Sequence, residues 1–371
     1  MSIAIALILI VVGGVAFTFL SPWWFTPLAS NWGQIDATLM ITMWVTGIVF
    51  VVINGFVAYS IIRYRYRKDR TAAYEPENKK LEWWLIGLTS LGIVILLAPG
   101  LFVYSEFVNV PEEALIAEAV GQQWQWSFRL PGEDGQLGRT NNKLVAFDNP
   151  FGLDPDDPAG QDDVLVPGNT LHLPKDRPVQ MLLRSKDLLH DFYVPSFRVK
   201  MDLVPGLVTS LWFTPTVAGT YEIACAEYCG LGHHAMRGVV VVEDAAAFDA
   251  WVAGKQTFAQ TRGGDDGGPV GDPQVALGAR LSQERGCLGC HSVDGASAIG
   301  PTWLGLYGKR EALADGTTVT ADDAYLKESI VAPAAKVVQG YPPAMPAYTN
   351  LSDEELAALV AYIASRSGDG E

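Results

Sequence analysis

The four cysteines of the chain lie in two short motifs whose residue types could bind redox metals. The first motif runs Cys225-Ala226-Glu227-Tyr228-Cys229-Gly230-Leu231-Gly232-His233-His234-Ala235-Met236. Its thiols, imidazoles and thioether are soft or borderline metal ligands. The second motif, Cys287-Leu288-Gly289-Cys290-His291, has the spacing of covalent c-type haem attachment. Copper ligands in one place and haem ligands in another are most simply interpreted as parts of an electron carrier.

The first motif fits three kinds of site, and the two that hold metal ions can take a further imidazole from His190. One is a tetrahedral zinc site made by Cys225, Cys229, His233 and His190. Another is a disulfide between the two cysteines, in an oxidising compartment. Zinc would leave Met236 unused, and a disulfide would leave the histidines unused as well. Two bridging thiolates, two imidazoles and a thioether can hold two copper ions, so the ligand types favour a dicopper centre over both alternatives.

The second motif defines a haem site. Cys287 and Cys290 would bond the haem vinyl groups, and His291 would be the proximal iron ligand. The distal ligand should be a methionine or histidine, and Met345, in a loop framed by prolines, is the only such residue after His291. A zinc site at this cysteine pair would lack a second pair of ligands.

Composition limits the possible partners. The 371 residues have room for two or three domains, and the formal net charge is −15. This acidity argues against a nucleic-acid partner. It suits electrostatic steering of a basic partner, such as a positively charged soluble cytochrome. The acidic residues could equally serve solubility alone, and the sequence leaves both interpretations open.

The first hundred residues are largely apolar and predict membrane spans. The runs Thr38–Ile62 and Trp83–Tyr104 each exceed the ~20 residues that a helix needs to cross a bilayer. The basic loop between them, Arg63 to Lys80, belongs in the cytoplasm by the positive-inside rule. Everything after Tyr104 is therefore expected on the outer, periplasmic side of a bacterial cell membrane. Residues 3–20 are either a cleaved signal or a third span, and the lack of a preceding basic residue favours a span.

The rest of the chain reads as a β-domain, a linker and a helical domain. Short β-type runs bounded by turn residues indicate an antiparallel sandwich or barrel. They cover 115–120, 164–166, 179–183, 207–213, 221–224 and 238–242. A polar, glycine-rich linker follows, centred on 261–269. Asp272-Pro273 then predicts a helix start, and Ser352 with Glu355 predicts a capping box before an apolar helical stripe.

These motifs together resemble subunit II of cytochrome c oxidase. The resemblance rests on C-x-E-x-C-G-x-x-H-x-x-M from Cys225 to Met236, D-x-x-H ending at His190, and K-x-D-x-x-P-G ending at Gly206. It covers about residues 38–243. The C-terminal segment, with Gly300-Pro301 after its haem motif, resembles class I cytochromes c.

The resemblance to subunit II implies a mixed-valence dinuclear copper centre, CuA, that accepts electrons from cytochrome c. By position, Cys225 and Cys229 would bridge both copper ions. His190 and His233 would each bind one copper ion, and Met236 would complete one of the two sites.

Further roles follow from the same resemblance. The main-chain carbonyl of Glu227 would complete the other copper site, and its side chain would reach a magnesium ion shared with subunit I. Trp124, in Gly121–Trp126, would be the residue where electrons enter, although a core aromatic is the simpler interpretation. His234 and His172 are expected at the surface.

Glu82 lies at the cytoplasmic edge of the last span and has two interpretations. It is either a hydrated interfacial carboxylate or a proton-uptake residue, since ionisable groups near the membrane interior often relay protons. In the family this span often begins L-E-x-x-W-T, followed by a proline. Here Leu85, Ile86 and Thr89 stand at those positions.

We therefore predict a multidomain fold in four parts. These are transmembrane helices in 1–108, a cupredoxin-like CuA domain in 109–253, a flexible linker in 254–272 and an all-α cytochrome c domain in 273–371. The implied function is that of the electron-transfer subunit of a terminal oxidase, coupled to proton translocation. Electrons would pass from a cytochrome c donor through haem c and CuA to an oxygen-reducing subunit I, with subunit III and membrane lipid as further partners.

Two other functions remain possible from the sequence. One is the CuA domain of a nitrous oxide reductase, against which the membrane hairpin and Glu227 count. The other is a membrane-anchored zinc- or copper-binding cytochrome without oxidase activity. A quinol-oxidase subunit II is disfavoured because that relative lacks the copper-binding cysteines.

Overall fold

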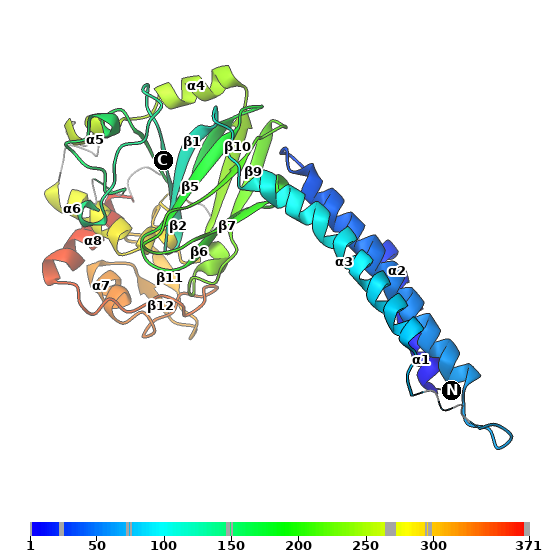
Figure 1. The fold of residues 1–371 in the computed structure, drawn as a ribbon. Helices are drawn as coiled ribbons and strands as arrows, with labels where there is room; N and C mark the ends of the chain where they lie inside the picture. The colour runs from blue at the N-terminus through cyan, green and yellow to red at the C-terminus, as the bar shows by residue number, and fades with distance from the viewer. Residues whose placement is uncertain are drawn as a thin grey trace. The chain divides into compact units, whose positions relative to one another are not determined.

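The computed structural model of the chain describes residues 2–21, 26–71, 74, 76–145, 149, 151–263, 272–293, 295 and 299–366. The chain folds as two compact units (Figure 1). One contains residues 1–111 together with 196–198, and the other contains 112–195 and 199–371.

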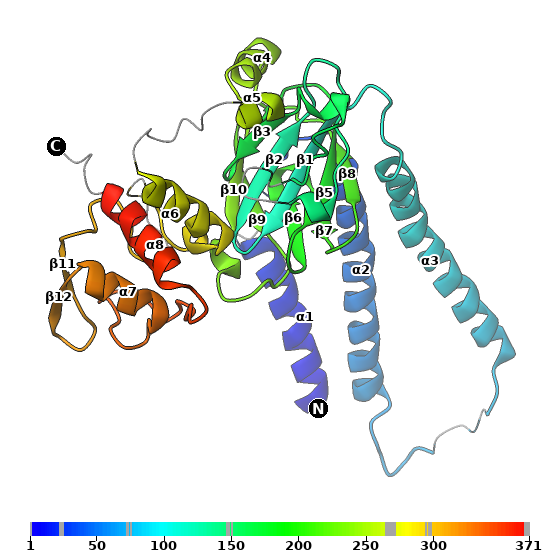
Figure 2. The same ribbon diagram turned by 90° about the vertical axis from the view of Figure 1, so that its left-hand side faces the viewer.

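Three long helices form the first unit: α1 (Ser2–Leu20), α2 (Gly33–Arg63) and α3 (Lys79–Phe107). All three are long and apolar enough to cross a membrane, and α2 packs against both of the others (Figure 2). The three apolar runs predicted from the sequence lie inside these helices. Asn54, the one amide in the second run, donates to the carbonyl of Phe50 at 2.8 Å, so its polar group is satisfied within the helix as lipid requires.

Residues 196–198 group with the first unit, and Arg198 forms a bidentate ion pair there. Arg198 donates to both carboxylate oxygens of Asp36, near the start of α2, at 2.6 and 2.9 Å. The same guanidinium donates to the carbonyl of Thr26 at 2.7 Å. Two parallel charge-assisted bonds fix orientation as well as distance, so residues 196–198 are held to the start of α2 within the first unit.

The second unit contains a sandwich of two five-stranded sheets. The first sheet has the order β3-β2-β1-β5-β8 and contains β1 (Leu115–Gln122), β2 (Gln125–Leu130), β3 (Val164–Pro167), β5 (Val179–Ser185) and β8 (Thr209–Phe213). The second has the order β4-β10-β9-β6-β7 and contains β4 (Thr170–Pro174), β6 (His190–Val194), β7 (Val199–Leu203), β9 (Gly219–Cys225) and β10 (Arg237–Glu243). Each sheet contains one parallel pair, β1 with β5 and β4 with β10. The predicted sandwich is confirmed as a mixed rather than a purely antiparallel one.

Aromatic and aliphatic side chains fill the space between the sheets. Trp126 of β2 and Phe192 of β6 are fully buried and meet edge to face, with ring centroids 5.9 Å apart. This arrangement suits the ring quadrupoles. It ties the strand that follows Trp124 to the strand that begins with His190.

Short helices complete the second unit. They are α4 (Ala245–Ala253), α5 (Phe258–Gly263), α6 (Pro273–Glu284), α7 (Asp323–Val331) and α8 (Asp353–Ser365), with a small hairpin of β11 (Arg310–Ala312) and β12 (Thr318–Thr320). The predicted helix start at Asp272 is confirmed, because its side chain accepts from the Gln274 amide at 2.9 Å. The capping box of Ser352 and Glu355 is also present.

Helix α5 lies within the range predicted as a linker. Its Phe258 is fully buried and packs with Val120, Phe151, Leu153 and Leu165 of the sandwich. Because the stretch is otherwise polar, the sequence did not predict that Phe258 would pack against this domain. Residues 264–271 of the predicted linker lie outside the described residues.

Candidate metal centre and haem pocket

Five of the six predicted copper ligands lie at the end of β9 and in the loop between β9 and β10. Cys225 is the last residue of β9, and Met236 directly precedes β10. The Cys225 amide donates to the Met236 carbonyl at 3.2 Å, which closes the loop on itself. A short 3₁₀ turn, His233–Ala235, folds the intervening chain inward. The loop therefore presents Cys229, His233 and Met236 on the same side as Cys225.

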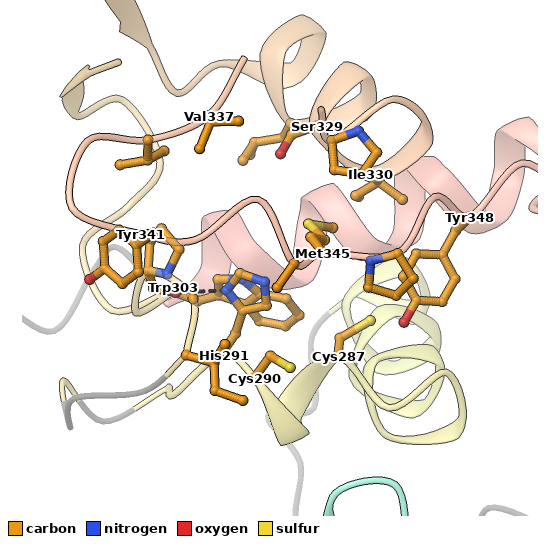
Figure 3. A pocket seen from close by; sticks show the side chains of 18 of the residues that line it. Cys287, Cys290, His291, Trp303, Ser329, Ile330, Val337, Tyr341, Met345 and Tyr348 are labelled. Atoms are coloured by element: carbon orange, nitrogen blue, oxygen red, sulfur yellow. Dashed lines mark hydrogen bonds between the residues drawn. The ribbon is translucent and has the colours of Figure 1, made fainter. Parts of the chain in front are cut away.

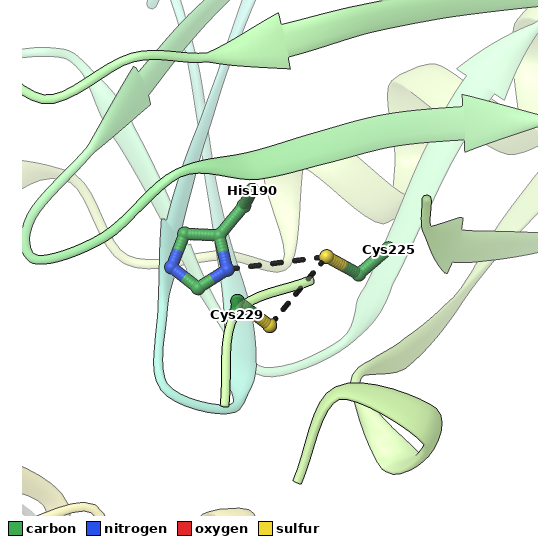
Figure 4. A group of neighbouring side chains, drawn as sticks. All are labelled: His190, Cys225 and Cys229. Atoms are coloured by element: carbon green, nitrogen blue, oxygen red, sulfur yellow. Dashed lines mark hydrogen bonds between the residues drawn. The ribbon is translucent and has the colours of Figure 1, made fainter. Parts of the chain in front are cut away.

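His190 reaches this loop through strand pairing. It begins β6, which runs antiparallel to β9 with Phe192 opposite Cys225. The His190 side chain is fully buried. Its Nδ1 lies 4.0 Å from Cys225 Sγ (Figure 4). The sheet thus brings together two ligands that are 35 residues apart in the chain.

The donor atoms form one compact cluster. Cys225 Sγ and Cys229 Sγ are 3.7 Å apart, and with one ring nitrogen of His190 their donor atoms lie within 4.8 Å of one another (Figure 4). Cys229 Sγ lies 3.7 Å from His233 Nδ1 and 3.9 Å from Met236 Sδ. Cys225 Sγ also lies 3.2 Å from the Glu227 carbonyl oxygen. All six groups implied by the resemblance converge, and the sulfurs are well beyond the ~2.05 Å of a disulfide.

This donor set fits copper better than a structural zinc ion. Met236 is buried with its thioether against Cys229, whereas a tetrahedral zinc site would be complete without it. Thiolate, imidazole and thioether together are the ligands of biological copper sites. The cluster is held by two adjacent strands and a self-closed loop, so its geometry is pre-organised.

Asp187 fixes the orientation of the His190 ring. Its Oδ1 lies 2.7 Å from His190 Nε2, which leaves Nδ1 facing Cys225. Burial by itself would lower the pKa of His190, but the bond to Asp187 and the neighbouring Cys225 raise it to about 9. Such a carboxylate behind a ligating imidazole sets its tautomer and increases its basicity.

The two thiols differ in how readily they ionise. Burial would raise the pKa of Cys225, but hydrogen bonds with His190 and with the backbone of Asp191 and Glu227 lower it. Burial, and then the charge of the nearby Cys225, raise the pKa of Cys229. Cys225 therefore ionises readily. Cys229 ionises only if the added negative charge is offset, and a cation bound by both sulfurs would offset it.

Trp124 touches the same loop. Its indole Nε1 donates to the Cys229 carbonyl at 3.1 Å, and Gln123 Nε2 donates to the same oxygen at 2.9 Å. A methyl group on Gly232 would stand 2.3 Å from the indole ring. The glycine is therefore required for the indole to lie flat against the ligand loop.

The haem motif follows α6 in a single 3₁₀ turn, Cys287–Gly289. His291 Nδ1 lies 2.7 Å from the Pro301 carbonyl, which leaves Nε2 as the free ring nitrogen. Burial lowers the pKa of His291, which favours the neutral imidazole that iron binds. A Cβ on Gly300 would lie 2.6 Å from this ring. The predicted Gly300-Pro301 pair therefore forms the cradle of the proximal histidine.

Met345 lines the same cavity as the cysteines and His291, and Figure 3 shows these side chains together in its wall. Leu359 and Ile363 of α8 also line the cavity, as the apolar stripe predicted. The remaining wall is largely apolar, with the two cysteines at one edge. The residues present thus fit a covalently attached haem with histidine and methionine ligands.

Comparison with known proteins identifies the two domains. The family model of the cytochrome c oxidase subunit II periplasmic domain matches residues 115–244, and that of cytochrome c matches 275–367. An alternative cytochrome c oxidase subunit 2 of Bradyrhizobium diazoefficiens is 52% identical over 71% of this chain and 95% of that protein. The chain belongs to the cytochrome c oxidase subunit 2 family. A cytochrome c oxidase subunit 2 of Alkalihalophilus pseudofirmus is 28% identical over 88% of this chain and 85% of that protein.

As a cytochrome c oxidase subunit II, the chain is a component of an oxidoreductase complex and associates with subunit I. Its two domains imply copper and haem c. The apolar helices make it a membrane-anchored subunit whose subunit II domain lies on the outer side. Family membership also favours the oxidase over the two other functions left open by the sequence.

Three predicted positions belong to neither the metal cluster nor the haem cavity lining. Glu82 lies exposed in the first turn of α3, without a side-chain partner among the described residues. His234 is exposed beside His233, as predicted. The surface prediction for His172 is wrong: its ring is half-buried, stacks on Trp251 at 4.3 Å and bonds Glu243 at 2.7 Å. The unpredicted helix α4 supplies the covering Trp251.

Sequence reasoning missed the groups around the ligands. Asp187 appeared only as the first letter of a D-x-x-H pattern, although that spacing is what places its carboxylate behind His190. Gln123 and Gly232 carried no signal of their own. Their roles appear only once the β1–β2 turn and the ligand loop lie together.

Proposed function

We propose that this subunit II accepts electrons at its haem c domain and delivers them through a dinuclear copper centre to subunit I. The convergence of two thiols, two imidazoles, a thioether and a carbonyl in one buried cluster carries this proposal. The haem and the copper pair would each supply one-electron transfer. Oxygen reduction and its coupling to proton translocation would take place with subunit I.

The positions of the donor atoms suggest which copper ion each ligand would bind. Cys225 and Cys229 stand at the middle of the cluster and would bridge both copper ions. His190 approaches on the Cys225 side and His233 on the Cys229 side, so each would bind one ion. Met236 lies beside Cys229 and the Glu227 carbonyl beside Cys225. Each ion would therefore have a different fourth ligand, Met236 for one and the Glu227 carbonyl for the other.

Trp124 is proposed as the residue through which electrons enter the copper centre. Its indole donates a hydrogen bond to the carbonyl of Cys229. One hydrogen bond and the covalent bonds within Cys229 therefore join the indole to a proposed bridging thiolate. The half-buried ring leaves part of its surface available to a donor. Covalent fusion makes delivery from haem c intramolecular, with an effective concentration that can reach millimolar.

Glu227 is proposed to hold the magnesium ion shared with subunit I. Its carbonyl points to Cys225 while its half-buried side chain remains available, and carboxylate oxygens are the ligands magnesium prefers. One residue would thus touch both metals. Subunit III and lipid are proposed as further neighbours, and Glu82 as a proton-uptake group.

The three helices are proposed to form a multi-pass anchor in a bacterial cell membrane. The basic loop between α2 and α3 carries Arg63, Arg65 and Arg67, which favours the cytoplasmic side. The metal-binding domains would then lie on the periplasmic side, where cytochromes c mature and basic donors circulate. The donor would be a cytochrome c drawn by the acidic surface.

Stopped-flow spectroscopy of the full chain tests this route. Reduced cytochrome c is mixed with chain holding haem and copper, and the haem and copper bands are followed separately. We expect haem reduction to depend on donor concentration and copper reduction to follow at a rate independent of chain concentration. A copper phase that accelerates in proportion to chain concentration would show transfer between molecules and contradict the route.

A further inference from the structure

Among the described residues, the wall of the haem cavity has one charged side chain. Of the described residues that line it, Lys336 alone is a lysine, arginine, aspartate or glutamate. A haem carries two propionate groups, and carboxylates are costly to place in apolar surroundings unless they are paired. A lone cation in such a wall stands where one of these anions could be neutralised.

The attachment chemistry determines which wall the propionates face. Thioether bonds to Cys287 and Cys290 would fix the vinyl-bearing edge of the porphyrin, and the propionates are on the opposite edge of the ring. Figure 3 shows Ser329 and Val337 across the cavity from the two cysteines. Lys336 directly precedes Val337 and lines the cavity with it.

The ammonium of Lys336 is held at the rim by Glu328 of α7. The Nζ–Oε2 distance is 2.5 Å, and both side chains are 40% exposed. An exposed pair of this kind contributes little to stability, so the lysine can turn toward a second carboxylate without a large loss. Ser329 and Tyr341 also line the cavity, and their hydroxyls are further hydrogen-bond donors there.

We propose that Lys336 binds a haem propionate and raises the midpoint potential of haem c, with Glu328 as its counter-ion. The inference rests on the proposed haem c site. The physical reason is that propionate charge favours ferric iron, which carries one more positive charge than ferrous iron. A cation beside the propionate offsets that preference through the low-dielectric pocket.

Redox titration of the full chain carrying Lys336→Gln tests the proposal. We expect covalent haem content and the Met345–iron charge-transfer band to be unchanged. At a fixed ambient potential, the ratio of reduced to oxidised haem should fall several-fold. Lys336→Arg should restore most of that ratio because it keeps the charge.

Lys309→Gln is the matched control. It removes one cation that is paired with Glu311 at 2.8 Å and does not belong to the described cavity lining. Equal midpoint potentials in Lys336→Gln and Lys309→Gln would overturn the propionate assignment. Absence of covalent haem from the wild-type chain would instead contradict the proposed haem c site itself.

Discussion

Asp187 and Gly232 act on the copper site without being ligands. Asp187 holds the buried ring of His190, and Gly232 makes room for the indole of Trp124. The ligand types were evident from the sequence because their chemistry is specific and their spacing is short. These supporting residues were not, because an aspartate or a glycine gains such a role only through contacts made in the fold.

Replacement of Asp187 by alanine should weaken copper binding. The His190 ring would lose its Nε2 partner and its fixed orientation, and loss of such an outer partner typically costs about 10–100-fold in metal affinity. Competition with a copper chelator measures the effect. Asp176→Asn, at an exposed aspartate paired with Lys175, is the control and should leave affinity unchanged. Equal copper affinities in the two variants would show that Asp187 does not support copper binding.

Gly232→Ala should slow electron transfer into copper while copper remains bound. The new methyl group would stand 2.3 Å from the indole and must displace it from the loop. Stopped-flow reduction by cytochrome c measures the rate, and the EPR spectrum checks the copper site. Gly254→Ala, where the methyl group meets its nearest atoms at 3.6 Å, should behave as wild type. An unchanged rate in Gly232→Ala would show that the indole position is unimportant.

The same contrast holds at the level of secondary structure. All three apolar helices and the six strands with strong β-type runs were predicted from sequence. Strands β2, β4, β6 and β7 were not, because polar residues such as Gln125, Thr170, Asp191 and Asp202 interrupt their apolar pattern. Pairing with neighbouring strands decides their conformation, and β6 then carries His190 to Cys225.

Helices α6 and α8 make the tightest contact of the cytochrome domain. A Cβ on Gly278 would lie 1.9 Å from the Ala358 carbonyl oxygen, so the two backbones touch through this glycine. Gly278→Ala should separate the helices and lower the free energy of unfolding by ~1–3 kcal/mol, the usual cost of overpacking. Thermal unfolding followed by haem absorbance measures the loss. Ala276→Ser, exposed on the same helix, is the control, and equal midpoints in both variants would contradict the close-contact account.

At the scale of the whole molecule, the subunit combines a membrane anchor, a copper domain and a haem domain in one acidic chain of net charge −15. Composition alone separated the anchor from the rest. It did not reveal Phe258, whose burial in the sandwich extends the ordered part of that domain into the range predicted as linker. A single aromatic in a polar stretch has no periodicity by which a sequence pattern could detect it.

The purified chain should transfer electrons but consume no oxygen. None of the five histidines of the sequence falls in α1, α2 or α3, so the anchor has no imidazole for a membrane haem or copper ion. An oxygen electrode with reduced cytochrome c measures this directly. Co-expression with subunit I should restore consumption, whereas uptake by the chain alone would place the oxygen chemistry in this subunit.

We propose that Cys225 and Cys229 would bridge two copper ions in a chain that also carries haem c. The most direct test is the EPR and optical spectrum of the full chain, matured with haem and loaded with copper, beside its Cys229→Ser variant. We expect a c-type haem spectrum and a multi-line signal from one electron shared by two coppers, with only that copper signal lost in the variant. Haem without the shared-electron signal, together with bound zinc, would contradict it.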